Sequence, residues 1–465
     1  MRFISTRGAA PALEFDDVLL AGLARDGGLY VPQAWPRLSA ATLAGFAGRP
    51  YAEVATAILK PFVGRAIRPG DLEAICSDAY IDFRHLAVAP LKQIAPDIFL
   101  LELFHGPTLA FKDYALQLVG RLFDHVLKAK GRRATIVGAT SGDTGSAAIE
   151  ALRDRASVDV FMLHPKGRIS EVQRRQMTTV HSANVHNLAI EGSFDDCQDL
   201  VKAMFADEAF RARHALSAVN SINFARIAAQ IVYYVVAAVA LGAPKRKVDF
   251  AVPTGNFGNV YAAHAARRMG LPVGRLIVGS NRNDILWRTI AKGDMSIAAV
   301  EPSLSPSMDI QVSSNFERLV FELWGRDGKA TARMVAAFRA EKRLVWPPAK
   351  LKRLRELFAA GRADDAETLA TIARIHRETG ETVDPHTAVG LAAAATVKRA
   401  KGAPLVALAC AHPAKFPDAI ARALGAKPPM PKAFAEQARR PERFAVLPRD
   451  LAAVKDFVAL RARAA

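Results

Sequence analysis

Short apolar runs alternate with amphipathic stretches over most of the chain beyond residue 133. Four of these runs are rich in β-branched residues and have the length of buried strands: residues 134–140, 158–165, 248–255 and 404–410. Each is followed by a stretch in which apolar positions recur with helical spacing. This alternation predicts an α/β fold with mainly parallel sheets.

The same pattern indicates how the chain divides. Residues 1–95 contain helical stretches interrupted by DGGLYVP and several prolines, and we predict an N-terminal domain there. A long apolar stretch, 228–244, ends at Pro244 before a charged triplet, and we predict a buried helix rather than a membrane span. We therefore expect α/β domains at 96–244 and 245–465, and a charged, alanine-rich helical stretch at 350–377.

Composition narrows the class of protein. A chain of 465 residues with 51% hydrophobic and 23% charged residues is typical of a globular protein of two or three domains. Its three cysteines, Cys76, Cys197 and Cys410, lie far apart and form no C-x-x-C pair. We predict no disulfide framework, no metal site and a cytoplasmic location.

The net charge of +18 is the other unusual bulk property. The basic residues occur in short scattered groups without aromatic residues between them, and no nucleic-acid-reading motif is present. We predict no binding to nucleic acid or membrane, and a general attraction for anions.

Three loops carry candidate chemistry, and the first contains Lys112. This lysine follows the apolar residues Leu109 to Phe111 and precedes Asp113 at an expected helix start. Desolvation lowers the pKa of an amine, so such a lysine is able to form a Schiff base. The alternative is a surface lysine in a first helical turn.

The second loop is Gly255–Asn256–Phe257–Gly258–Asn259, between an expected strand and helix. Glycines let backbone amides approach an anion, and a helix N-terminus adds partial positive charge, so the loop is a candidate phosphate cradle. It matches neither the P-loop nor the dinucleotide fingerprint, which disfavours ATP and NAD.

The third loop is Ser141–Gly142–Asp143–Thr144–Gly145, again between a strand and a helix. Its amides and hydroxyls suit a substrate carboxylate. The alternative is ordinary helix capping by Ser141, Asp143 or Thr144.

Together the loops resemble those of pyridoxal-phosphate enzymes of the tryptophan-synthase β-subunit type, and the wider sequence is similar to the long-chain threonine synthase family. The matching segments span nearly the whole chain in the order of the family: STRG (5–8), GLARDGGLYVP (22–32), HGPTLAFKD (105–113), TSGDTG (140–145), NSINFARI (220–227), PTGNFGN (253–259), SPSMDIQVSSNFERL (305–319), DPHTAVG (384–390) and AHPAKFPDA (411–419).

This resemblance implies an architecture and residue roles. Two open α/β domains would hold pyridoxal 5'-phosphate between them, with the N-terminal domain packed alongside. Lys112 would form the Schiff base, the Gly255 to Asn259 loop would surround the cofactor phosphate, and the Ser141 to Gly145 turn would face the substrate carboxylate.

At two positions, Asp143 and Cys410, the residue differs from the one usual in related enzymes. Asp143 stands where many related enzymes have an asparagine near the cofactor's phenolic oxygen. Cys410 stands where the family usually has a threonine or serine at the pyridine nitrogen, and a thiol is a weaker hydrogen-bonding group. We expect Cys410 to tune the site without abolishing it.

The activity implied is conversion of O-phospho-L-homoserine and water to L-threonine and phosphate, with Lys112 moving protons. The leaving phosphate needs cationic and polar groups, and our candidates are Ser221, Asn223 and Arg226; the alternative is helix capping and a salt bridge. The rival functions are another pyridoxal-phosphate lyase, such as a serine or threonine dehydratase or a phosphohydroxy-amino-acid lyase, and a non-catalytic relative that acts as a binding or regulatory protein. We expect a monomer or homodimer.

Overall fold

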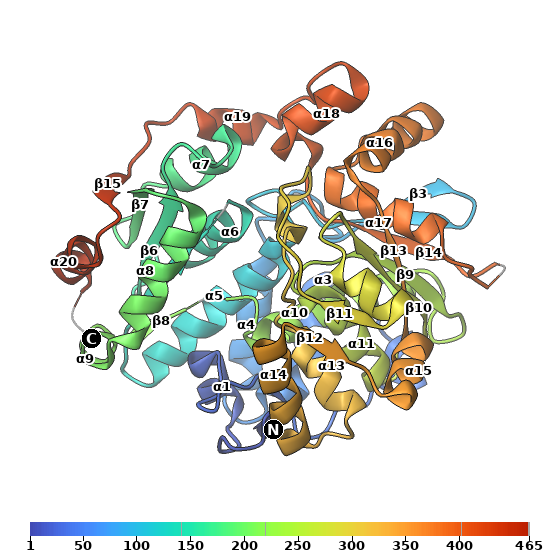
Figure 1. The fold of residues 1–465 in the computed structure, drawn as a ribbon, viewed down its shortest axis with the longest axis horizontal. Helices are drawn as coiled ribbons and strands as arrows, with labels where there is room; N and C mark the ends of the chain where they lie inside the picture. Colours follow the sequence, from blue (N-terminus) through green and yellow to red (C-terminus); the bar gives the residue numbers. More distant parts are fainter. Residues whose placement is uncertain (141, 219, 401, 464–465) are drawn as a thin grey trace.

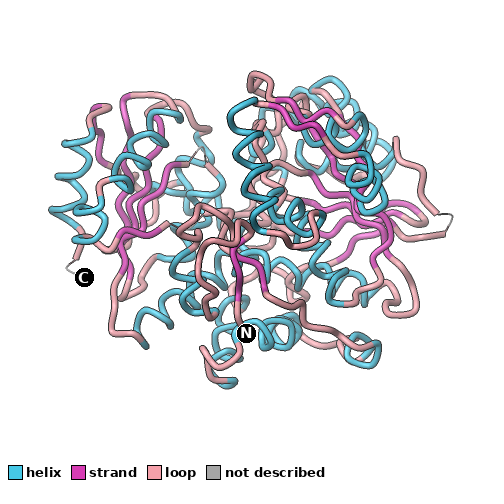
Figure 2. Tube along the Cα trace, turned by 60° about the horizontal axis from the view of Figure 1, so that its bottom comes forward, coloured by secondary structure: helices cyan, strands magenta, loops and turns pink. Residues whose placement is uncertain are grey.

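The computed structural model describes residues 1–140, 142–218, 220–400 and 402–463. Two separate sheets form the framework, one on each side of a group of central helices (Figures 1 and 2). Every pair of neighbouring strands in these sheets is parallel except one, which confirms the expected α/β class.

The larger sheet has six strands and lies on the right in Figure 1. Its strands, in spatial order, are β13 (Phe358–Arg362), β10 (Val273–Ser280), β9 (Val248–Pro253), β14 (Leu405–Ala409), β4 (Ile98–Glu102) and β3 (Leu91–Ala95). Only β3 and β4 are antiparallel. Every residue of β9 and β14 is buried, which explains why their sequences are apolar apart from Asp249.

The smaller sheet has five parallel strands and lies on the left. Its strands, in spatial order, are β15 (Ala445–Pro448), β7 (Val185–Glu191), β6 (Val158–Pro165), β5 (Ala134–Ala139) and β8 (Leu216–Ser217). Two short antiparallel pairs complete the strands of the described residues: β1 (Phe3–Ser5) with β2 (Tyr30–Pro32), and β11 (Asp294–Ser296) with β12 (Arg343–Val345).

Helices cover both sheets and fill the space between them. The helices in about the first half of the chain are α1 (Phe15–Ala21), α2 (Ala40–Ala44), α3 (Tyr51–Val63), α4 (Pro69–Tyr80), α5 (Lys112–Ala129), α6 (Asp143–Leu152), α7 (Glu171–Thr178), α8 (Phe194–Ala206), α9 (Glu208–Arg213) and α10 (Phe224–Ala240). Those that follow are α11 (Gly258–Met269), α12 (Ile285–Trp287), η1 (Arg288–Lys292), η2 (Pro306–Met308), α13 (Phe316–Leu323), α14 (Gly328–Glu341), α15 (Pro348–Leu357), α16 (Asp365–Thr379), α17 (Pro385–Ala395), η3 (Pro413–Lys415), α18 (Pro417–Leu424), α19 (Lys432–Ala438) and α20 (Leu451–Arg461).

Some strands belong to a different sheet from the one expected from the domain boundaries at 95/96 and 244/245. Strands β3 and β4 precede the smaller sheet in the chain but belong to the larger one, and β15 returns from the larger sheet to the edge of the smaller one. In Figure 1 the red C-terminal segment crosses the top of the molecule to make this return. A division of the chain into domains therefore has to place these segments with the sheet they join.

One local expectation was wrong. The stretch 350–377 is not one helical region, because β13 separates α15 from α16 and pairs with the edge of β10. Phe358 at the start of β13 is buried, and the pairing satisfies backbone groups that a continuous helix would have satisfied internally.

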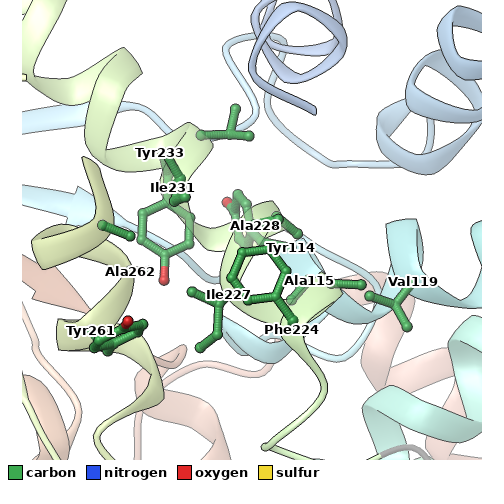
Figure 3. Close-up of a cluster of buried hydrophobic side chains, with 14 of the residues drawn as sticks. Tyr114, Ala115, Val119, Phe224, Ile227, Ala228, Ile231, Tyr233, Tyr261 and Ala262 are labelled. Carbon is green, nitrogen blue, oxygen red and sulfur yellow. The ribbon is translucent and has the colours of Figure 1, made fainter. Parts of the chain in front are cut away.

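The apolar stretch near residue 230 forms α10, and nearly all of its residues are buried. Figure 3 shows side chains of α10, including Ile227 and Tyr233, packed among Tyr114 of α5 and Tyr261 of α11. This shared core fixes α5, α10 and α11 relative to one another. No helix of the described residues is long and apolar enough to cross a membrane.

Candidate active site

Lys112 is the first residue of α5, and the loop before it is tied to the end of β14. Ala110 forms an antiparallel bridge with Ala411, and the Phe111 amide donates to the Cys410 carbonyl at 2.8 Å. The lysine therefore begins its helix at the carboxyl end of a central strand of the larger sheet, where ligands collect in α/β folds.

The amine of Lys112 is buried, with 7% of the residue exposed. Its Nζ lies 3.2 Å from Asp143 Oδ2 and 3.1 Å from Ser307 Oγ. Burial lowers the pKa of Lys112, and Asp143 only partly opposes this effect. The alternative of a surface lysine is excluded, and the environment favours a nucleophilic amine.

Asp143 opens α6 at the carboxyl end of β5, so the two sheets meet at its contact with Lys112. Its other oxygen, Oδ1, accepts from Lys415 Nζ at 2.8 Å and from Gln173 Nε2 at 3.0 Å. Burial favours the neutral acid, but the charges of Lys112 and Lys415 outweigh it and hold the pKa of Asp143 well below its usual range.

The turn from residue 140 to 145 is organised by Thr140. Its hydroxyl oxygen accepts from the amides of Gly142 and Gly145, both at 2.9 Å. Gly142 has a φ of 143°, and a Cβ there would lie 2.5 Å from the Gln173 side chain, so only glycine fits. Thr144 is half-buried, Ser141 lies outside the described residues, and the N-cap residue of α6 is Gly142, which has no side chain to cap the helix.

The Gly255 to Asn259 loop joins β9 to α11. No backbone N–H group of residues 255–260 donates to a backbone carbonyl of the described residues, so these amides are free for an anion. A Cβ on Gly255 would lie 2.6 Å from the Ser307 carbonyl oxygen. The glycine thus lets the loop pack against the segment that carries Ser307 to Lys112.

Two other residues of this loop are held by their side chains. Phe257 is buried with φ at 64° and packs edge-on against Phe316. Asn259 Oδ1 accepts from the hydroxyls of Tyr233 and Tyr234, at 2.5 and 2.7 Å. Its Nδ2 is buried and has no hydrogen-bond partner among the described residues. Because buried donors normally have an acceptor, this atom is a candidate donor to a bound ligand.

Asn315 ties this loop to the start of α10. Its amide donates to the Asn256 carbonyl at 3.1 Å, and its Nδ2 donates to the Ser221 carbonyl at 3.0 Å. Asn223 caps α10 through its side-chain oxygen, while its Nδ2 donates to the Leu19 carbonyl at 2.8 Å. Asn223 is therefore a helix cap, the alternative to a phosphate ligand, and both its side-chain oxygen and its side-chain nitrogen already make hydrogen bonds.

Arg226, in the first turn of α10, is buried but, unlike Asn223, has side-chain nitrogen atoms without hydrogen-bond partners among the described residues. Only 4% of the residue is exposed, and its Nε and Nη1 atoms have no partner among the described residues. Burial lowers the pKa of the guanidinium to about 10, and its charge is felt at Lys112. A buried, unpaired cation at the positive end of a helix is unfavourable unless an anion is bound there.

Cys410 directly follows β14 and lies beside a buried polar network at the start of α17. Its amide donates to Thr387 Oγ1 at 3.0 Å, and the Thr387 hydroxyl donates to Asp384 Oδ2. Asp384 also accepts from His386 Nδ1 at 2.9 Å. Burial raises the pKa of the Cys410 thiol well above its usual range, so the thiol is neutral, and its Sγ donates to the Leu408 carbonyl at 3.6 Å.

The helices α5, α6, α10 and α11 thus begin around one region, joined by contacts of Lys112, Asp143, Ser307 and Asn315. A buried amine, free loop amides and an unpaired guanidinium suit a phosphorylated carbonyl compound. The described residues hold no group of His, Cys, Asp and Glu suited to a metal. The fold and the site define a pyridoxal-phosphate-dependent enzyme of fold type II.

Comparisons with known proteins refine this class. Residues 84–345 match the model of the pyridoxal-phosphate dependent enzymes, and residues 2–80 and 387–458 match the models named Threonine synthase N terminus and Threonine synthase, C-terminal. The chain is 55% identical to a threonine synthase of Pseudomonas aeruginosa over 459 residues, 98% of each chain. The chain belongs to the threonine synthase family.

Solved structures agree with this assignment. The pyridoxal-phosphate-bound threonine synthase of Brucella melitensis superposes with a TM-score of 0.98 at 51% identity, covering 100% of both chains. Threonine synthase from yeast superposes with a TM-score of 0.94 at 36% identity, covering 99% of this chain and 98% of that one. The expected cofactor and fold type are therefore confirmed.

Sequence reasoning missed four residues of the site: Thr140, Gln173, Ser307 and Lys415. Three of them lie in segments that the family resemblance had already marked, so membership of those segments was the available signal. Gln173 lies on α7 outside any such segment, and only the fold brings it to Asp143.

Proposed function

We propose that the chain converts O-phospho-L-homoserine and water to L-threonine and phosphate. Family membership over the whole chain supports this reaction above those of the other lyases of the class. The observation that carries it at the level of the site is Arg226, whose buried guanidinium is unpaired among the described residues and close enough to influence Lys112. A substrate with a phosphate group would supply the missing anion.

The residues present fit the cofactor. The free amides of residues 255–260 and the buried Asn259 Nδ2 are suited to its phosphate, and Cys410 is placed at the strand end beside the lysine loop. Pyridoxal phosphate, when bound, supplies a carbonyl carbon for Lys112 and an electron sink for charge on the substrate carbons.

The substrate carboxylate would bind at the turn that includes Ser141, Gly142, Thr144 and Gly145. The leaving phosphate would bind Arg226, with the half-buried Ser221 nearby on the segment before α10. Because both side-chain groups of Asn223 hold α10 in place, we assign it the role of positioning Arg226 rather than of contacting phosphate.

Lys112 moves protons in this scheme. Its Nζ contacts both Asp143 and Ser307, and the lowered pKa of its amine favours the neutral form that acts as a base. Ser307 Oγ and Asp143 hold this atom from two sides and so fix the direction in which it takes and returns a proton.

The test is an assay of phosphate release and threonine formation on O-phospho-L-homoserine, with the wild type and Lys112→Ala. We expect threonine to appear in step with phosphate, and both the activity and the visible absorbance due to the lysine–cofactor bond to be lost in the variant. Phosphate release without threonine, or no reaction with this substrate, would retain the cofactor and refute the synthase reaction.

We also propose a cytoplasmic location, a monomer or homodimer, and no nucleic-acid partner. Cys76, Cys197 and Cys410 are all free thiols, which supports a reducing compartment. The basic residues occur in short groups scattered along the sequence, which supports the absence of a nucleic-acid site.

A further inference from the structure

Two buried lysines share the carboxylate of Asp143. Lys415, on η3, has a side chain with no exposed surface, and its Nζ lies 2.8 Å from Asp143 Oδ1 and 2.8 Å from the Thr108 carbonyl oxygen. Lys112 Nζ lies farther away, 3.2 Å from Oδ2. The site therefore contains one more buried amine than this carboxylate can neutralise.

The geometry distinguishes the two amines. Lys415 has two acceptors at short distances, one a carboxylate and one a carbonyl, and both require it to donate. Lys112 has one longer contact with the carboxylate, and its second partner, the Ser307 hydroxyl, is able either to accept from an ammonium or to donate to a neutral amine. Lys415 thus makes the closer ion pair with Asp143, and Lys112 makes the looser one.

We propose that Lys415 is the permanent counter-ion of Asp143 and that this pairing leaves Lys112 free to become a neutral amine. Without Lys415, deprotonation of Lys112 would leave a buried carboxylate with no cation, which is strongly unfavourable. With it, Lys112 loses and regains a proton while Asp143 stays paired. Lys415 is therefore a positioning residue for the proposed reaction, not a group that contacts the reacting atoms.

Other ionisable groups act on the same pair. The charges that act on Lys112, Asp143 or Lys415, besides one another, come from Asp113 on α5, Arg226 on α10 and His386 on α17. Arg226 also disfavours the charged form of Lys112, but it has no contact with Asp143, so it cannot replace Lys415 as the partner of the carboxylate.

The experiment compares the holoenzyme with Lys415→Met and with the charge-retaining control Lys415→Arg. The visible absorbance of the bound cofactor is titrated against pH, which reports the proton held at the Lys112 nitrogen independently of turnover. In Lys415→Met the Lys112 nitrogen becomes the remaining cation in contact with Asp143, so we expect the midpoint to rise by about one pH unit or more. In Lys415→Arg it should stay near the wild-type value.

A purely structural role for Lys415 gives a different result. The thermal midpoint and the amount of holoenzyme would fall in Lys415→Met, but the pH midpoint of the absorbance would not move, and that outcome overturns the proposal. In activity assays the proposal expects the loss in Lys415→Met to fall mainly on kcat, with less change in KM, because substrate contacts are retained.

Two further variants decide the question if Lys415→Met does not fold. In Asp143→Asn the charge of Lys415 remains without its carboxylate and repels a proton at Lys112, whereas Asp143→Asn combined with Lys415→Met removes both charges. We expect the pH midpoint to be lower in the single variant than in the double variant. Equal midpoints would show that Lys112 does not sense Lys415. A wild-type activity that fails on O-phospho-L-homoserine would refute the proposed reaction while leaving this titration intact.

Discussion

Replacing Arg226 with methionine should leave the folded protein as stable as before, or more stable, while weakening its hold on phosphate. The guanidinium is buried and two of its nitrogen atoms have no partner among the described residues. Replacing a buried ion pair with apolar side chains of similar volume is often neutral or stabilising by about 1–4 kcal/mol, and a buried charge without a partner has no Coulombic attraction to lose. At about 2.1 cal/mol/K per residue, this chain length converts each kcal/mol into a thermal shift of about 1 °C.

Arg318 offers a matched control. It is fully buried, and burial lowers the pKa of its guanidinium to about 10, as it does for Arg226. Its nitrogen atoms, however, donate to the carbonyls of Tyr30 and Ile222 and to Asn315 Oδ1. Arg318→Met leaves these acceptors without a donor and should destabilise the protein by about 3–5 kcal/mol.

The cost of Arg226→Met should appear in binding. A charge-assisted hydrogen bond contributes about 1.5–3 kcal/mol, which corresponds to roughly a 10- to 150-fold rise in KM for O-phospho-L-homoserine. The assays are thermal unfolding without substrate, unfolding with added inorganic phosphate, and steady-state kinetics. Phosphate should stabilise the wild type and have less effect on the variant. A variant that loses stability as Arg318→Met does, with KM unchanged, would refute the assignment of Arg226 as an anion ligand.

Three other substitutions test further parts of the site and core. Gly255→Ala places a Cβ 2.6 Å from the Ser307 carbonyl, so absorbance titration should show weaker cofactor binding, and unchanged affinity would contradict the close packing. Thr387→Val leaves the buried Cys410 amide without its acceptor and should lower the free energy of unfolding by about 1–3 kcal/mol in denaturant titrations. His264 has its pKa lowered by burial to about 3, so the unfolded chain binds more protons than the folded one between that pH and about 6.5. The folded state is therefore destabilised as pH falls, by about 2 kcal/mol at pH 5. The free energy of unfolding should fall less between pH 7 and pH 5 in His264→Leu than in the wild type. Equal losses in the two proteins would contradict burial of a neutral imidazole.

The sequence by itself determined the local features of this protein. Strands β5, β6, β9 and β14 were recognisable because parallel strands buried on both faces need mainly apolar residues. The Lys112 loop and the glycine loop were recognisable because their residue types serve chemistry that few other patterns serve.

Only the tertiary structure decided which distant segments meet. Ser307 contacts Lys112 from 195 positions away, and Lys415 contacts Asp143 from the far end of the chain. The edge strand β13 was missed because its alanine-rich sequence has no strand signal of its own and pairs only because β10 presents an open edge. Local pattern predicted many of the helices and strands, though not β13. The charges around Lys112 depend on how the two sheets are placed relative to each other, and no short stretch of sequence contains that information.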